Sequence, residues 1–213
     1  MIRGMIFDLD GTLLDTIEDL TTASNRAMEE YGFPTFSADE IKMKVGNGNR
    51  NLMLRCLPEG KKDLTDEALG KFKKHYAECY MEKTVPYEGV YETVEKLYEK
   101  GIKLAVNTNK LNEYCEKLIQ KNFPGIEFVG IIGNKEGYPL KPDPMAANEL
   151  IEKMGLEKEE VVYVGDSGPD MQTAQNAGIK SVWVPWGFRS YDQIKDLHPD
   201  YVLEKAEDLL KLL

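Results

Sequence analysis

Two aspartates stand one residue apart, directly after a short apolar run near the N-terminus. Asp8 and Asp10 follow the apolar residues 5–7, and Gly11 comes next. Because side chains alternate along an extended chain, both carboxylates point to the same side of it. Paired carboxylates are typical of nucleophilic catalysis, general acid–base catalysis and the binding of hard cations. An Asp-Gly pair between apolar residues also favours a tight hairpin turn, so this motif alone leaves both interpretations open.

Residues that could hold a phosphate group follow two later segments of the chain. Thr108 and Asn109 come after an apolar run and before a helical pattern, where hydroxyl and backbone N–H groups can bind anions. In isolation, a simple N-cap for that helix is the more common role of such residues. Lys141 precedes Pro142-Asp143-Pro144, where a helix is expected to begin with Asp143 as its N-cap and Pro144 as its first residue. A lone lysine is usually a solvated charge, but the restricted backbone beside a helix start favours phosphate binding.

The apolar run 161–164 also ends in acidic residues. Asp166 follows this run much as Asp8 follows its own, and Asp170 comes shortly afterwards, where another helix is expected to begin. Asp170 could form a helix-capping pair with Ser167, or it could lie beside a metal ion. Asp166 is therefore a candidate metal ligand, and Asp170 is a candidate for the layer of residues around that metal.

Regular elements must position these residues. Apolar runs typical of strands alternate with helical patterns, which predicts an α/β fold with a parallel sheet, right-handed crossovers and helices on both faces. In open parallel sheets ligands bind beyond the carboxyl ends of the strands, so the candidate residues would meet in one crevice. The predicted strands are Met1–Phe7, Gly101–Val106, Phe128–Ile132, Val161–Val164, Lys180–Val184 and Tyr201–Leu203, and the predicted helices are Tyr87–Lys100, Leu111–Asn122, Pro144–Met154, one that ends at Ala177 and a short one that ends at Leu213.

The stretch 15–83 departs from this alternation, because it contains no β-branched run and has the pattern of successive helices. Ser37 and Glu40, for example, match a capping box. We interpret the stretch as a helical lid inserted after the first strand, which leaves a discontinuous core of residues 1–14 and 84–213. Within the lid, a glycine-rich loop makes Asn47 and Arg50 candidates for substrate specificity, although a plain interhelical loop is equally compatible.

Charge and composition exclude several classes of function. The 213 residues include 27 Lys and Arg against 37 Asp and Glu, so the surface repels nucleic acid and anionic membranes. No apolar run is long enough to span a bilayer and the N-terminus lacks a secretory signal, which predicts a cytoplasmic protein. The three cysteines have no paired spacing, which argues against disulfides and zinc and for reduced, mostly buried thiols. The expected partner is a small phosphorylated metabolite, and the oligomeric state is undetermined.

The candidate residues together predict metal-assisted phosphoryl transfer. Asp8, Asp10 and Asp166 offer hard oxygen ligands for Mg²⁺, while Thr108 and Lys141 offer donors to a phosphate. Asp8 would attack phosphorus to form an aspartyl-phosphate, and Asp10 would protonate the leaving group and then activate water. Two unit charges about 4 Å apart repel by about 4 kcal/mol at an effective dielectric near 20, so Mg²⁺ and Lys141 are needed beside Asp8.

The same residues resemble the motifs of a known family. The four motifs of the haloacid dehalogenase superfamily are matched in order, over nearly the whole chain, by Asp8-Leu9-Asp10-Gly11-Thr12, Thr108, Lys141 and Gly165-Asp166 with Asp170. The resemblance implies a Rossmann-like core with a helical cap inserted after the first motif, with Asp8 as nucleophile and Asp10 as acid and base. It implies Mg²⁺ held by Asp8, the Asp10 carbonyl and Asp166. The second aspartate of the first motif implies a phosphatase or a phosphomutase.

Within the superfamily the chain is most similar to phosphoglycolate phosphatases, through the cap loop Val45-Gly46-Asn47-Gly48, through Thr108-Asn109-Lys110 and through Trp186-Gly187. Phosphomutases of the β-phosphoglucomutase type share the four motifs and are the nearest alternative. A signalling receiver domain, which also gathers acids, a threonine and a lysine around Mg²⁺, would keep a stable phospho-aspartate, but the helical insert argues against it. A non-catalytic module that binds phosphate esters is the remaining alternative.

Overall fold

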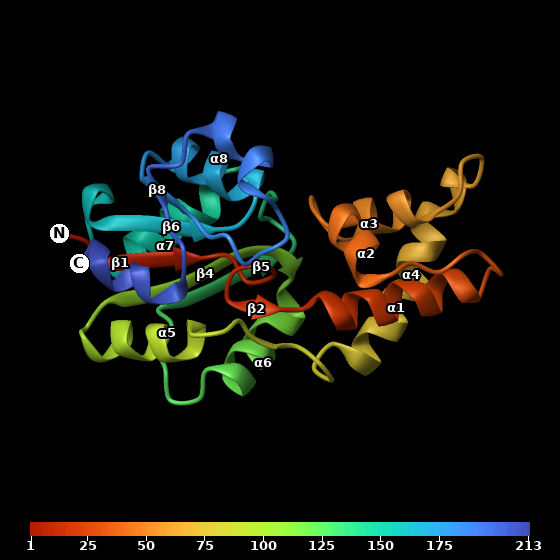
Figure 1. Ribbon diagram of the computed structural model, residues 1–213, viewed down its shortest axis with the longest axis horizontal. Coiled ribbons are helices and arrows are strands. Elements are labelled where there is room, and N and C mark those ends of the chain that lie inside the picture. Colours follow the sequence, from red (N-terminus) through yellow and green to blue (C-terminus); the bar gives the residue numbers. More distant parts are fainter. The chain divides into compact units, whose positions relative to one another are not determined.

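The computed structural model describes all residues, 1–213, and they form two compact units (Figure 1). The first unit consists of Met1–Leu14 and Pro86–Leu213, and the second consists of Asp15–Val85. The boundary expected from the sequence after residue 83 differs from this division by two residues. The chain passes from one unit to the other at β2 (Leu14–Asp15) and returns at β3 (Val85–Pro86), and these two short strands pair with each other.

The first unit is built on a six-stranded sheet with the order β5-β4-β1-β6-β7-β8. All pairings in this sheet are parallel. The predicted α/β fold class, with a parallel sheet, is therefore confirmed. The strands are β1 (Gly4–Phe7), β4 (Lys103–Leu111), β5 (Gly130–Asn134), β6 (Val161–Gly165), β7 (Lys180–Trp183) and β8 (Tyr201–Val202).

Helices cover both faces of this sheet, which explains why β1 and β6 are apolar and buried along their whole length. In Figure 1, α5 and α6 lie on the face of the sheet opposite to α8. Residues of α7 and α8 share one buried cluster with Ile6 and Tyr163 of the central strands. The helices are α5 (Val90–Glu99), α6 (Asn112–Asn122), α7 (Met145–Met154) and α8 (Gly168–Ala177).

Several element boundaries differ from those that the sequence predicts. β4 continues through the polar residues after Val106 as far as Leu111, and α6 begins only at Asn112. Pro144 is the N-cap of α7, whereas Asp143 accepts a hydrogen bond from the backbone N–H of Met145 at 2.9 Å. The short helix expected at the C-terminus is a 3₁₀ helix over Ala206–Leu212.

Apart from the strand residues at its two ends, the second unit contains only helices and the loops between them, and the apolar sides of its first and last helices face each other in its core. Phe72 and Tyr76 of the last helix are fully buried and stacked at 5.3 Å between ring centroids. The predicted capping box of Ser37 and Glu40 is present. The helices are α1 (Ile17–Glu29), α2 (Ala38–Lys44), α3 (Asn49–Cys56) and α4 (Thr65–Cys79), with a 3₁₀ turn at Lys62–Leu64. None of the helices in either unit has the length and apolar character needed to cross a membrane.

Candidate active site

The carboxyl ends of the strands β1, β4 and β6 carry most of the predicted chemical groups. Asp8 directly follows β1, Thr108 lies in the last part of β4, and Asp166 directly follows β6. Lys141 comes from the loop between β5 and α7. Because the strands are parallel, these ends lie along one edge of the sheet, where α/β proteins bind their ligands.

Lys141 joins two of the aspartates in a buried ionic cluster. Its Nζ lies 2.8 Å from Asp8 Oδ1 and 2.6 Å from Asp170 Oδ1. The exposed fractions of the Lys141 and Asp170 side chains are only 4% and 0%. Charges buried to this extent are stable only when they are paired and hydrogen-bonded. Lys141 is therefore held directly beside the predicted nucleophile.

Three carboxylates face this single ammonium group. Asp8, Asp166 and Asp170 are all buried, and each offers an oxygen within 4.8 Å of the oxygens of the others. Such an excess of negative charge in a buried space requires protons or a further cation. Hard carboxylate oxygens are the ligands that Mg²⁺ prefers in proteins, so this donor set fits a divalent cation of that kind.

Burial and mutual repulsion raise the pKa values of these acids. Burial raises the pKa of Asp8 to about 6, against the opposing effect of Lys141. Burial, followed by the charges of Asp170 and Asp8, raises the pKa of Asp166 to about 8. Burial alone would lower the pKa of Lys141, but Asp170 and Asp8 raise it well above its ordinary value. At neutral pH Asp8 is thus an anion beside a cationic lysine, as a nucleophilic carboxylate must be.

Both donors to Asp8 approach the same oxygen atom. The backbone N–H of Leu9 donates to Oδ1 at 2.7 Å, and Lys141 reaches that oxygen as well. This arrangement fixes the rotation of the carboxylate and leaves Oδ2 for other partners. Leu9 itself is fully buried, so its side chain anchors the turn that carries Asp8.

Asp10 is paired with a lysine to which the sequence reasoning assigned no role. Lys110 Nζ lies 2.9 Å from Asp10 Oδ1 and 3.2 Å from Oδ2. Only 2% of the Lys110 side chain is exposed, against 18% for Asp10. Lys110 and Thr108 are two residues apart on an extended strand and therefore point to the same side. The sequence could have indicated that Lys110 lies beside Thr108, but only if the strand had been predicted to continue past Val106.

Thr108 and Asn109 lie in β4, so neither of them caps α6. Thr108 is buried, and its Oγ1 accepts a hydrogen bond from the Lys110 backbone N–H at 3.3 Å. The Asn109 side chain accepts from the Lys141 backbone N–H at 2.8 Å and donates to the Lys141 carbonyl at 3.4 Å. Asn109 thus fixes the loop that carries Lys141, and its side chain has this role in addition to any contact with phosphate.

Asp170 forms the capping pair that its sequence position suggested and also contacts Lys141, while its place beside a metal ion stays a prediction. Its Oδ2 accepts hydrogen bonds from the backbone N–H and the hydroxyl of Ser167, at 2.9 and 2.6 Å, and so completes a capping box at the start of α8. Its Oδ1 contacts Lys141. Capping therefore orients the carboxylate that holds the lysine.

The candidate specificity residues belong to the helical unit. Asn47 has a positive φ of 58°, and its carbonyl accepts a hydrogen bond from the Asn51 side chain. Arg50 makes an exposed two-point ion pair with Asp66, at 2.7 and 3.2 Å. Their part in substrate choice stays a prediction.

A search for similar proteins gives consistent matches along the whole chain. A family sequence model described as haloacid dehalogenase-like hydrolase matches residues 5–184. Phosphoglycolate phosphatases from Vibrio parahaemolyticus and Aquifex aeolicus are 32% and 34% identical, over 100% of this chain and 96% and 97% of theirs. A crystal structure from Lactobacillus delbrueckii subsp. bulgaricus, whose assignment as a phosphoglycolate phosphatase is itself a prediction, has a TM-score of 0.90 at 32% identity, covering 99% of this chain and 97% of that one.

The matched range 5–184 includes all four motifs, and the relatives match the chain over its full length. The resemblance inferred from the sequence is confirmed, and the chain belongs to the haloacid dehalogenase-like hydrolase family.

Proposed function

We propose that the protein is a Mg²⁺-dependent phosphatase that hydrolyses a small phosphate monoester, with phosphoglycolate as the first candidate substrate. The contact of Lys141 with Asp8, at 2.8 Å inside a buried acidic cluster, is the observation that carries this proposal. Phosphoglycolate phosphatases that match the chain over its full length support the substrate. The three cysteines are free and buried, and free thiols are typical of proteins in the reducing cytoplasm. This supports the cytoplasm as the compartment in which the protein acts.

The first step transfers the phosphoryl group to the enzyme. A carboxylate oxygen of Asp8 forms a bond to phosphorus, the bond between phosphorus and the ester oxygen breaks, and that oxygen receives a proton from Asp10. Lys141 offsets the repulsion between Asp8 and the phosphate, and Thr108 is placed to hold a phosphate oxygen. Mg²⁺ held by Asp8, the Asp10 carbonyl and Asp166 would supply further neutralisation of negative charge.

The second step reverses the proton transfer. Asp10, now a carboxylate, takes a proton from a water molecule, and the water oxygen attacks phosphorus. The bond between phosphorus and Asp8 breaks, inorganic phosphate leaves, and Asp8 is restored. Lys110 contacts both oxygens of Asp10 and so fixes the carboxylate through which both proton transfers run.

The experiment that tests this proposal measures phosphate release from a panel of small esters, with Mg²⁺ and with a chelator. The panel includes phosphoglycolate and β-glucose 1-phosphate. Wild-type protein should release phosphate only with Mg²⁺ and fastest from its own substrate, whereas Asp8→Asn should be inactive. Asp63→Asn, at an exposed aspartate of the helical unit, is the control and should keep full activity.

Other outcomes identify the alternatives. Conversion of β-glucose 1-phosphate to an isomeric phosphate, without release of inorganic phosphate, would indicate a mutase. A phospho-protein that persists after treatment with a small phosphodonor, with no turnover of any ester, would indicate the receiver alternative. A chain that binds these esters without either reaction would be a binding module.

A further inference from the structure

Asp166 is held at two points by residues at the end of β7 and just after it. The backbone N–H of Phe188 donates to Asp166 Oδ2 at 2.6 Å, and this bond is buried. The indole N–H of Trp183, at the end of β7, donates to the Asp166 backbone carbonyl at 3.0 Å. Both the carboxylate and the backbone of this residue are therefore held by the same segment of the chain.

Gly187, the residue before Phe188, approaches Asp166 more closely than any side chain would allow. A Cβ at this position would lie 2.3 Å from Asp166 Cβ and 2.3 Å from the Gly11 carbonyl oxygen. Carbon atoms in van der Waals contact are about 3.5–4 Å apart, so an added Cβ would push both Asp166 and the Gly11 carbonyl out of place. Glycine is therefore required here because two backbone segments and a carboxylate meet, a close approach that only a residue without Cβ permits.

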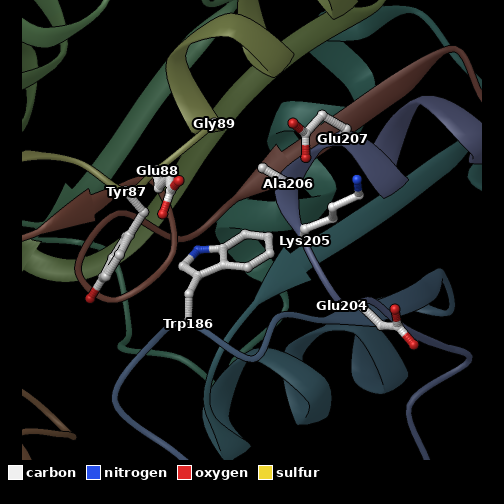
Figure 2. A pocket seen from close by; sticks show the side chains of 8 residues that line it. All are labelled: Tyr87, Glu88, Gly89, Trp186, Glu204, Lys205, Ala206 and Glu207. Carbon is white, nitrogen blue, oxygen red and sulfur yellow. The ribbon is translucent and has the colours of Figure 1, made fainter.

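Trp186 extends the same contact to the turn that follows Asp10. Its indole N–H donates to the Thr12 carbonyl at 3.0 Å, and the Thr12 hydroxyl lies 3.4 Å from Asp166 Oδ1. Figure 2 shows the Trp186 ring at the wall of a cavity of about 450 Å³ that Tyr87 and Lys205 also line. The ring thus has the motif-bearing turn on one side and open space on the other.

We infer that Trp186, Gly187 and Phe188 are positioning residues that hold the Asp166 carboxylate in register with Asp8 for metal binding; this rests on the proposed function. We call these residues the 186–188 clamp. A metal ligand must be deprotonated, and a deprotonated Asp166 lies among like charges, since Asp8 and Asp170 are within 4.8 Å, so repulsion alone would turn the carboxylates apart. The Phe188 amide opposes this rotation at Oδ2, while the close contact of Gly187 keeps Asp166 against the turn after Asp10. Groups that orient metal ligands in this way typically change metal affinity about 10- to 100-fold when they are altered.

The decisive measurement is Mg²⁺ binding to the full-length protein by titration calorimetry, without any ester, combined with thermal unfolding in a chelator. Gly187→Ala should raise the Kd for Mg²⁺ about 10- to 100-fold. Trp186→Phe keeps a ring at the cavity wall and removes only the indole donor, so it should raise the Kd by a smaller factor. Gly168→Ala is the matched control, because its added methyl group would meet only Leu197 Cδ1, at 3.5 Å. It should bind Mg²⁺ like the wild type.

The outcomes separate this inference from the proposed function. A wild-type protein that binds no Mg²⁺ would overturn the proposed metal site itself. A wild type that binds, together with a folded Gly187→Ala variant of equal affinity, would overturn the clamp even if the variant is less stable in chelator. If Gly187→Ala does not fold, Trp186→Phe decides in the same way, because an unchanged Kd for this variant would overturn the clamp and a raised Kd would support it.

Discussion

Individual charged residues at the sheet edge have unequal tasks, and Asp10 depends most on a single partner. Its carboxylate contacts Lys110 through both oxygens, while Asp8, Asp166 and Asp170 form the separate acidic cluster. The proposed mechanism therefore gives both proton transfers to the side chain of Asp10 and leaves only its backbone carbonyl for the metal. This division of labour follows from two lysines that each hold a different aspartate.

Asp10→Asn should lower kcat about 10²- to 10⁴-fold, because general acid–base catalysis typically contributes that much. Binding of Mg²⁺, measured by calorimetry, should change little, since the Asp10 side chain lies outside the acidic cluster. If this variant keeps the full kcat, Asp10 is not the general acid and base of the reaction.

Lys110→Met should lower kcat about 10- to 100-fold, because a hydrogen bond to a charged group is worth about 1.5–3 kcal/mol. Lys110→Arg keeps the charge and should recover part of the loss. An exposed lysine of the first unit offers the control, and Lys100→Met should leave kcat unchanged. Equal kinetics for Lys110→Met and the wild type would show that Asp10 needs no partner.

The acidic cluster also predicts how stability depends on pH without metal. The pKa values of Asp8 and Asp166 are raised from 3.8 to about 6 and about 8. Between about pH 4 and 8 the folded metal-free protein therefore holds protons that the unfolded chain has lost. The free energy of unfolding should fall as pH rises through this window, by several kcal/mol in total.

Mg²⁺ should reverse this trend, since metal ligands must be deprotonated and binding stabilises the folded state. Thermal unfolding at pH 5, 6, 7 and 8, with chelator and with Mg²⁺, measures the difference, and the shift in Tm caused by Mg²⁺ should grow with pH. Asp166→Asn should lose most of both effects. If the Tm shift caused by Mg²⁺ is the same at all four pH values, the raised pKa values of the buried aspartates are contradicted.

Among the elements, β4 departs most from its sequence pattern. The polar residues after Val106 predict a loop, yet the strand continues to Leu111 and pairs with β5 through an irregular register. Polar residues usually indicate a loop, but here Asn107, Thr108 and Lys110 are buried in the folded protein, and the strand continues through them. Their polarity fits the functional groups that the end of β4 carries. Sequence reasoning therefore found Thr108 and Asn109 but ended the strand too early to align Lys110 with them.

The close approach of Gly187 has a different origin and was beyond the reach of sequence reasoning. Gly155 and Gly178, for example, directly follow the predicted helix ends at Met154 and Ala177, and they end these helices in left-handed geometry, as glycine commonly does. Gly187 follows no such local rule, since its requirement comes from Asp166 and Gly11, which are remote in the chain. Only the folded structure brings these three residues together.

Within the helical unit, α1 carries a buried acid that fixes the end of the unit. Asp19 is only 1% exposed and accepts hydrogen bonds from the backbone N–H groups of Lys83 and Thr84 and from the Thr84 hydroxyl. Asp19→Ala would leave these donors unsatisfied and should lower the free energy of unfolding by about 3 kcal/mol.

Urea unfolding measures this effect. Asp63→Ala is a matched exposed control within the same unit, and it should change the free energy of unfolding by less than about 0.5 kcal/mol. Equal stabilities for the two variants would show that the Asp19 hydrogen bonds contribute nothing net.

At the scale of the whole molecule, the candidate catalytic groups and the candidate specificity residues lie in different units. All members of the acidic cluster and both active-site lysines belong to the first unit, whereas Asn47 and Arg50 belong to the second. The alternating pattern predicted the fold class, and the four motifs predicted the family, because Asp8, Thr108 and Asp166 lie at strand ends that this pattern marks and Lys141 lies in the loop between β5 and α7. Substrate choice has no comparable signal, since a glycine-rich loop between helices is compatible with many roles.

Arg50→Ala should change the ratio of kcat/KM between phosphoglycolate and an uncharged-tail ester while leaving Mg²⁺ affinity unchanged. Asp66→Ala is the matched control, because it breaks the same exposed ion pair and keeps the arginine. An exposed pair contributes only about 0–1 kcal/mol to stability, so both variants should fold. If the two variants have identical kinetics, Arg50 has no role in substrate choice beyond its ion pair with Asp66.

The chain contains only two tryptophans, and both lie beside the candidate site. Each donates its indole N–H to a backbone carbonyl there, Trp183 to Asp166 and Trp186 to Thr12. Indole emission responds to the hydrogen bonding and polarity around the ring. The natural fluorescence of the unlabelled protein should therefore report both arrival of a cation and turnover of an ester in real time, and Trp183→Phe would isolate the signal of the 186–188 clamp.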